Sequence, residues 1–178
     1  MKILERKFSL VVSMALLVVA GSSMINTAAG EENPADRKGL LPEFQLEVMD
    51  ENFNVTRGSL EGRFYIIYFW GTECQQCKDD IQNLQKVYEE VDQESFEILS
   101  ISADRKEENV RRYQEVFSMP WYHTVIGGDP NLLVSVAKTF EIENWPYALL
   151  ISPEGNVIST YKSVDKAKLE SEIRSAMN

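Results

Sequence analysis

The sequence has only two cysteines, one histidine and few basic residues, with 18 Lys and Arg against 28 Asp and Glu among its 178 residues. A closed structural zinc site takes four ligands, and two cysteines and one histidine are too few to form the usual site. The sequence therefore argues against structural zinc. Phosphate binding favours clustered Lys and Arg, and the net charge of -10 argues against nucleic acid as a partner. No internal repeat or low-complexity tract is present. Since 44% of the residues are hydrophobic, one sizeable core is expected.

The N-terminal 29 residues have the composition of an export signal. Three cationic side chains precede an apolar stretch at residues 8–20, and small and polar residues follow up to Ala29. The apolar stretch is shorter than the roughly 20 residues that a membrane span needs, so we predict cleavage after Ala29 rather than a retained anchor. The protein is therefore expected outside the cytoplasm, in the periplasm or attached to the membrane on that side.

Residues 30–39 are polar and are interpreted as a tether, whereas residues 40–178 show the alternating pattern of a single α/β domain. Residues 64–70 form a continuous aromatic and β-branched run, which is typical of a central strand with helices on both faces. The other expected strands cover residues 44–48, 54–56, 96–101, 122–126, 147–152 and 156–160. Four helices are expected. The first follows the cysteines, the second covers residues 106–118, and the third begins at Asp129-Pro130. The fourth closes the chain and carries Leu169, Ile173 and Met177 on one side.

Cys74 and Cys77 directly follow the run at residues 64–70, where the strand is expected to give way to a helix. Because the stabilisation from a disulfide grows with the loop it closes, a bond across this short spacing contributes little to the fold. The start of a helix stabilises a thiolate through unpaired N–H groups and the positive end of its dipole. Helical periodicity places Cys77 on the buried stripe and Cys74 at the exposed start. We therefore predict that Cys74 is the nucleophile and that Cys77 resolves a mixed disulfide with the substrate.

The order of elements and three motifs resemble the thioredoxin superfamily, and within it the TlpA/ResA-like exported thiol-disulfide oxidoreductases. The motifs are Phe69-Trp70-Gly71-Thr72-x-Cys74-x-x-Cys77, Trp145-Pro146, and Pro153-Glu154-Gly155-Asn156-Val157-Ile158. The resemblance covers residues 40–178. It implies a thioredoxin-like fold with a central mixed β-sheet flanked by helices, an N-terminal β-hairpin extension, and an inserted helix-strand unit at residues 106–126.

The same resemblance implies an enzyme with a redox-active disulfide that acts on a disulfide-bonded protein substrate. A membrane electron donor would keep the dithiol reduced, as in cytochrome c maturation; no cofactor and no metal are implied, and we expect a monomer. Trp70 and Asp80 are expected to support the dithiol, Asp80 through proton transfer; a solvent-facing or capping carboxylate is the alternative for Asp80. A cis Pro146 is expected to shape the substrate groove, with Trp145 and Tyr147 beside it.

The charges beside the dithiol in the sequence favour a reductant. Glu73 precedes Cys74, Asp79 and Asp80 follow Cys77, and Lys78 is the only nearby cation. Negative neighbours disfavour a thiolate. A less stabilised thiolate makes the disulfide form harder to reduce, so a strong oxidant is not expected. The acid that thioredoxins bury six residues before the first cysteine is replaced by Tyr68.

Two other classes of function stay open. One is a non-catalytic binding module, including a copper chaperone, since some thioredoxin-fold copper chaperones combine two cysteines with a distant histidine. Those proteins space their cysteines one residue wider, and His123 has no partner at a ligand spacing, so we interpret it as an ordinary histidine. The other class is a thiol peroxidase, for which Thr72 is present but the upstream proline of peroxiredoxins is missing.

Overall fold

The computed structural model describes residues 39–177. The expected export signal at residues 1–29 lies outside this range, as does the expected tether apart from Gly39. Gly39 belongs to the short strand β1 (Gly39–Leu40) and pairs with Val157. In the part of the chain that the structure describes, no helix has the length and apolarity that crossing a membrane requires.

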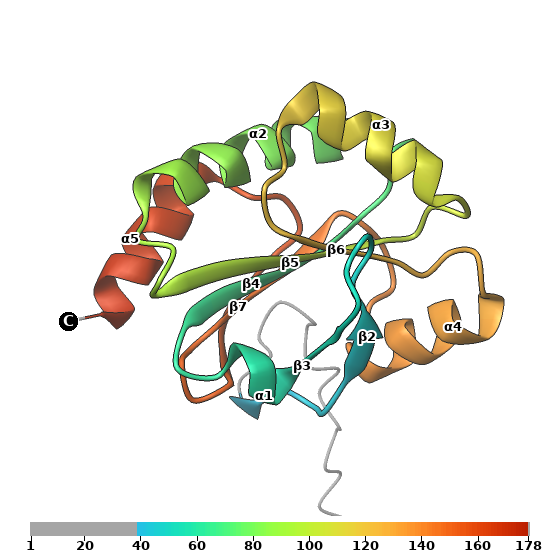
Figure 1. Ribbon diagram of the computed structural model, residues 1–178. Coiled ribbons are helices and arrows are strands. Elements are labelled where there is room, and N and C mark those ends of the chain that lie inside the picture. The colour runs from blue at the N-terminus through green and yellow to red at the C-terminus, as the bar shows by residue number, and fades with distance from the viewer. Residues whose placement is uncertain (1–38, 178) are drawn as a thin grey trace, which may run out of the picture. The chain divides into compact units, whose positions relative to one another are not determined.

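A mixed sheet of six strands forms the centre of the domain, in the order β1-β8-β7-β4-β5-β6 (Figure 1). The strands β4 (Phe64–Trp70), β5 (Phe96–Ser102) and β6 (Tyr122–Val125) are parallel to one another. On the other side of β4, the hairpin of β7 (Tyr147–Ile151) and β8 (Asn156–Tyr161) is antiparallel. All seven residues of β4 are buried, which confirms the predicted central strand.

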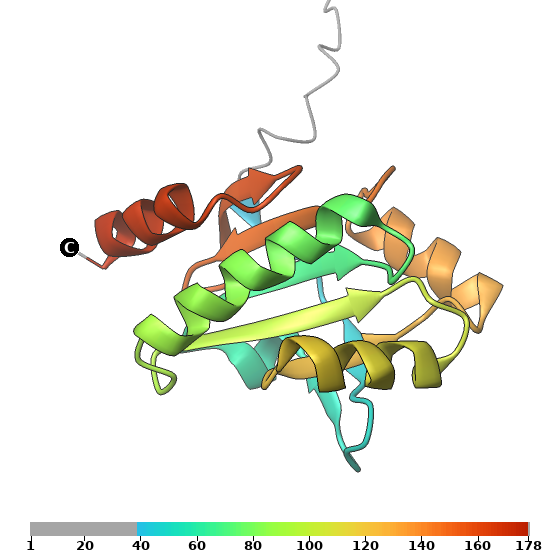
Figure 2. The same ribbon diagram turned by 90° about the horizontal axis from the view of Figure 1, so that it is seen from above.

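Helices cover both faces of this sheet. On one face lie α2 (Gln75–Glu90), α3 (Glu107–Phe117) and α5 (Lys166–Ala176), and Figure 2 shows α2 crossing over β4 and β5. On the other face lie α4, α1 and a separate antiparallel hairpin of β2 and β3. The bounds of these elements are Pro130–Thr139, Arg57–Leu60, Gln45–Glu47 and Asn54–Thr56. The predicted N-terminal hairpin and inserted helix-strand unit are thus confirmed.

Alternation along β4 divides the core into two clusters. Tyr68 and Trp70 pack in the cluster beneath α2, whereas Ile67 and Phe69 pack in the cluster on the α4 side. Trp70, the last residue of β4, therefore points its indole toward the face of the sheet that α2 covers.

The ends of two helices test the sequence-based predictions in detail. Asp129 caps α4 as predicted, since its Oδ1 accepts from the backbone N–H groups of Asn131 at 2.8 Å and Leu132 at 3.3 Å. The prediction that Met177 lies on the buried side of the last helix is wrong. That helix ends at Ala176, and the side chain of Met177 is exposed.

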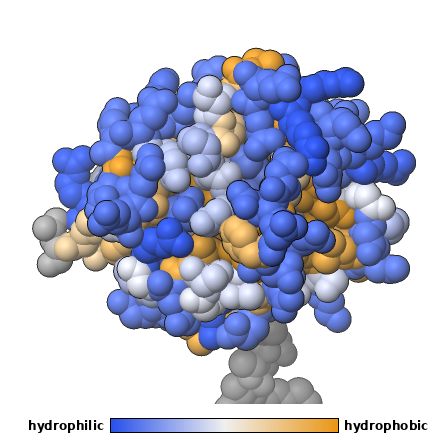
Figure 3. Space-filling model, in the orientation of Figure 1, coloured by the Kyte–Doolittle hydropathy of each residue, from blue (hydrophilic) through white to orange (hydrophobic). Residues whose placement is uncertain are grey.

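The face of the molecule shown in Figure 3 has no large apolar patch. Hydrophilic residues dominate it, and the apolar ones form small separate groups. The exposed large apolar residues come from distant segments: Leu40, Phe53, Val116, Val134, Trp145 and Met177. Single exposed apolar residues are normal in soluble domains.

Candidate active site

The two cysteines lie where the chain leaves β4 and enters α2. Cys74 is the N-cap of α2, and its Sγ accepts a hydrogen bond from the backbone N–H of Cys77 at 3.2 Å. The two residues form a disulfide, with their Cα atoms 5.3 Å apart. Cys77 is fully buried and Cys74 is half-buried, which confirms the arrangement predicted from periodicity. A molecule approaching from solvent can therefore contact Cys74 but not Cys77, and Cys74 lies at the positive end of the helix dipole.

A groove of about 830 Å³ opens beside Cys74. Three segments line it: residues 71–76, residues 103–106 together with Asn109, and the pair Trp145-Pro146. Cys77 is not among its lining residues. The groove is therefore built from the segments that follow β4 and β5, including the first turns of α2 and α3, and from the loop that precedes β7.

The Trp145-Pro146 peptide bond is cis, as the resemblance predicts. Both residues line the groove, and Trp145 is 45% exposed there. Tyr147 does not line it, so its predicted place beside the groove is corrected. It is the first residue of β7, is 6% exposed, and packs in the α4-side cluster together with its partner Phe69. Closeness to Pro146 in the sequence does not bring Tyr147 to the groove, because alternation along the strand turns its side chain toward the α4-side cluster.

Two cations in the groove wall were missed from the sequence. Arg105 and Lys106 line the groove from the loop between β5 and α3, and Glu73 lines it from the segment that carries Cys74. The expectation that Lys78 is the only cation near the dithiol is therefore wrong. It rested on sequence neighbours, whereas the sheet brings the β5–α3 loop to the same edge as the dithiol.

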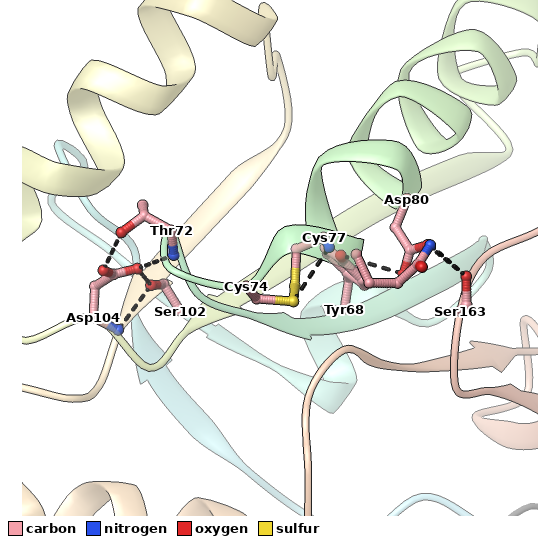
Figure 4. Close-up of a disulfide and its surroundings, with 9 residues drawn as sticks. Tyr68, Thr72, Cys74, Cys77, Asp80, Ser102, Asp104 and Ser163 are labelled. Carbon is pink, nitrogen blue, oxygen red and sulfur yellow. Dashed lines mark hydrogen bonds between the residues drawn. A yellow bond between two sulfur atoms is a disulfide. The ribbon is translucent and has the colours of Figure 1, made fainter.

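Asp104 joins this loop to the segment before Cys74 (Figure 4). Its carboxylate accepts from the backbone N–H of Thr72 at 2.9 Å, from Thr72 Oγ1 at 2.5 Å and from Ser102 Oγ at 2.6 Å. Gly127 allows the loop to pack closely, because a Cβ there would lie 1.9 Å from the carbonyl oxygen of Ala103. Sequence reasoning did not identify Asp104, although its position just after a buried strand could have marked it as a loop residue at the edge of the sheet.

Asp80 lies on the other side of the disulfide from Asp104 (Figure 4) and is fully buried. Its Oδ1 accepts from Ser163 Oγ at 2.8 Å and from Gln76 Nε2 at 3.3 Å, while Tyr68 Oη lies 3.5 Å from its Oδ2. Burial raises the pKa of Asp80, and the hydrogen bonds from Ser163 and Gln76 oppose that shift. The alternative of a solvent-facing carboxylate is thereby excluded.

Tyr68 occupies the position of the buried acid of thioredoxins, and it points to the same cluster as Asp80. Burial, followed by the charge of Asp80, raises the pKa of Tyr68. Its hydroxyl therefore stays protonated and can donate to the carboxylate. The buried acid on this side of the disulfide is thus Asp80 of α2, and Tyr68 of β4 supplies a hydrogen-bond donor to it.

Trp70 supports the groove from within. Its indole is fully buried, and its ring centroid lies 5.3 Å from that of Tyr113 on α3. Its carbonyl oxygen accepts from the backbone N–H of Ala103 at 2.9 Å. Trp70 therefore connects the end of β4 to the loop that carries Asp104.

His123 is a buried structural residue on β6. Its Nε2 lies 3.0 Å from the carbonyl oxygen of Met119 and its Nδ1 lies 2.6 Å from Ser100 Oγ. A carbonyl oxygen can only accept, so Nε2 carries the proton and Nδ1 accepts from the hydroxyl of Ser100. Burial lowers the pKa of His123 to about 4. Within residues 39–177, no group of three or more His, Cys, Asp and Glu side chains could hold a metal ion.

The fold and the site together define a thioredoxin-fold dithiol protein, with one accessible and one buried cysteine at the start of the helix after the central strand. Comparison with known families agrees. Residues 62–157 match the family described as thioredoxin-like, and the chain belongs to this family.

Curated proteins similar to this chain include several named thiol-disulfide oxidoreductase ResA. The protein from Halalkalibacterium halodurans is 25% identical over 118 residues, which cover 66% of this chain and 64% of that relative, less than two thirds of its length. The protein from Bacillus subtilis is 25% identical over 167 residues, covering 93% of this chain and 87% of the relative. Among solved structures, a putative thiol:disulfide interchange protein DsbE from Chlorobium tepidum has the same fold, with a TM-score of 0.68 at 16% identity over 81% of this chain and 99% of that one.

Proposed function

We propose that the protein is a thiol-disulfide oxidoreductase that reduces disulfides of protein substrates outside the cytoplasm. The observation that carries this proposal is the pair of sulfurs, one half-buried in a groove at the start of α2 and the other fully buried behind it. Only the sulfur of Cys74 can meet a substrate disulfide, and only Cys77 is placed to reach Cys74 afterwards.

The reaction begins with the dithiol form. The Cys74 thiolate attacks one sulfur of the substrate disulfide, which forms a mixed disulfide and releases the other substrate sulfur as a thiolate. Cys77 then loses its proton and attacks the sulfur of Cys74. The second substrate sulfur leaves, and the Cys74–Cys77 disulfide remains. Two electrons pass to the substrate, so a dithiol electron donor must reduce the protein again.

The charges around the dithiol support the reducing direction. Asp80 is fully buried and follows Cys77 by three residues on α2, and a second negative charge near it in a poorly solvated region is costly. Arg105 and Lys106 act in the opposite sense, but both are exposed and water screens their charges. The buried carboxylate therefore dominates, and it disfavours a stable thiolate.

The relatives named ResA and the composition of the first 29 residues support the cellular setting. We propose that the protein is exported, that a membrane electron donor keeps its dithiol reduced, and that its substrates include the disulfides formed during cytochrome c maturation. We further propose that it acts as a monomer. Pro146 and Trp145 then form the wall along which the substrate docks.

The midpoint potential of the Cys74–Cys77 pair tests the proposed direction. We expect a clearly reducing value, together with rapid oxidation of the reduced protein by a peptide disulfide. A potential near the roughly -120 mV of the strongest oxidising dithiol proteins would overturn the direction. If the reduced protein did not react with peptide disulfides at all, the non-catalytic binding module would be the better assignment.

A further inference from the structure

Gln76 connects the groove to the buried carboxylate of Asp80. It lies between the two cysteines, is exposed, and lines the groove. Its Nε2 lies 3.3 Å from Asp80 Oδ1 and 3.1 Å from Ser163 Oγ. Of the residues that the structure describes, Gln76 is the only one that both lines the groove and has a hydrogen bond to Asp80.

The two oxygens of Asp80 face different surroundings. Oδ2 lies toward the hydroxyl of Tyr68 in the core, whereas Oδ1 accepts from Gln76 and from Ser163, whose Oγ is 2.8 Å away. Gln76 and Ser163 are themselves exposed, and Asp80 has no exposed surface. These two side chains therefore lie between the carboxylate and solvent, and Gln76 is the one on the substrate side.

Asp80 is also the neighbour of Cys77 along α2. Residues three apart in a helix lie on the same side, and both Cys77 and Asp80 are fully buried. In the resolving step the Cys77 thiol must give its proton to a base before its sulfur attacks Cys74. An ionised Asp80 carboxylate is a suitable acceptor. Burial raises the pKa of Asp80, and the hydrogen-bond donors on Oδ1 act against that rise.

We propose that Gln76 is a positioning residue, whose side-chain amide holds the Asp80 carboxylate in place behind Cys77 and thereby controls proton removal in the resolving step. This inference rests on the proposed oxidoreductase function. The inference gives Gln76 a specific role, which is its hydrogen bond to Asp80. This role is separate from any general effect that the Gln75-Gln76 dipeptide has on the properties of the dithiol.

The test is the pH dependence of the resolving step in Gln76→Met. Methionine has a similar length and still covers Asp80, but it cannot donate a hydrogen bond. The rate at which Cys77 releases a peptide from its mixed disulfide with Cys74 is followed by rapid mixing between pH 5 and 9. Because one donor to the carboxylate is lost, we expect the midpoint of the pH profile to rise by about 0.5 to 1 unit.

Two further variants separate this contact from a general effect of the dipeptide. Gln75→Met changes the neighbouring exposed groove residue, which has no hydrogen bond to Asp80, and its midpoint should match that of the wild type whatever its rate. In an Asp80→Asn background, Gln76→Met should shift nothing. The inference is overturned if Gln76→Met leaves the midpoint unchanged, if Gln75→Met shifts it equally, or if the shift persists in Asp80→Asn.

A second readout keeps this inference distinct from the proposed function. If the wild-type protein does not react with peptide disulfides, the proposed function fails and no resolving step can be measured. The side-chain carboxyl resonance of Asp80 can still be titrated by NMR in the reduced protein. A pKa of Asp80 that is higher in Gln76→Met than in the wild type supports the contact, and an equal pKa rejects it.

Discussion

Removing the carboxylate of Asp104 should loosen the segment that presents Cys74. In Asp104→Ala, the backbone N–H and the hydroxyl of Thr72 both lose their acceptor, as does the hydroxyl of Ser102. A hydrogen bond to a charged group contributes roughly 1.5–3 kcal/mol to stability and a neutral one about 0.5–1.5 kcal/mol. Asp104 lines an open groove, where water can replace part of what is lost. The lower range of about 0.5–1.5 kcal/mol per bond therefore applies, so losing three bonds is expected to cost about 1.5–4.5 kcal/mol.

The rate should fall together with the stability. Thr72 is two residues before Cys74, and a displacement of about 1 Å at a reacting group can cost about 100-fold in rate. We expect the second-order rate constant of the reduced protein with a peptide disulfide to drop by about 10-fold to 100-fold. Urea unfolding of the oxidised protein gives the free energy, and rapid mixing gives the rate constant.

Asp79→Ala is the matched control, because Asp79 is an exposed carboxylate of α2 beside the same disulfide. Its unfolding free energy should stay within about 0.5 kcal/mol of the wild type. The role given to Asp104 is refuted if Asp104→Ala behaves like Asp79→Ala in both measurements.

Three other outcomes are expected. The pKa of His123 falls from 6.5 in the unfolded chain to about 4 in the fold, so the stability it contributes is present above pH 6.5 and lost as the pH falls toward 4. The loss between pH 7.5 and 5 should be about 2 kcal/mol, and His123→Gln should remove this slope in urea unfolding. The pKa of Asp80 is raised in the folded protein, so the stability that Asp80 contributes is lost as the pH rises through its folded pKa. Asp80→Asn should therefore be more stable than the wild type at pH 7 but not at pH 3. Replacing Arg105 and Lys106 by Glu should slow reaction with a peptide disulfide flanked by Asp, speed it with one flanked by Lys, and have less effect at 1 M salt.

The sequence predicted those parts of the site that depend on local features, such as helical periodicity and a continuous apolar run. Periodicity along α2 places Cys77 inward and Cys74 at the helix start, and the continuous apolar run of β4 identifies the strand before them. The resemblance added the cis Pro146, which no local pattern indicates.

The parts that were missed depend on which loops the sheet brings together. Asp104 and Arg105 are remote from the dithiol in the sequence, and only the pairing of β4 with β5 places their loop beside it. Asp80 is predicted as a supporting residue, but periodicity leaves its burial open because it lies at the edge of the helical stripe; its partner Ser163 comes from the β8–α5 connection. The place of Tyr147 depends on strand alternation, which turns it to the α4 side together with its partner Phe69.

The most direct test of the central claim is the covalent product that each cysteine variant forms with a peptide disulfide. Cys77→Ser cannot resolve the mixed disulfide, so we predict that intact-mass analysis finds one peptide attached to Cys74 and released by a reductant. Cys74→Ser should form no such adduct under the same conditions, because its remaining sulfur is buried. Absence of an adduct on Cys77→Ser, or an equal yield on Cys74→Ser, would contradict the account.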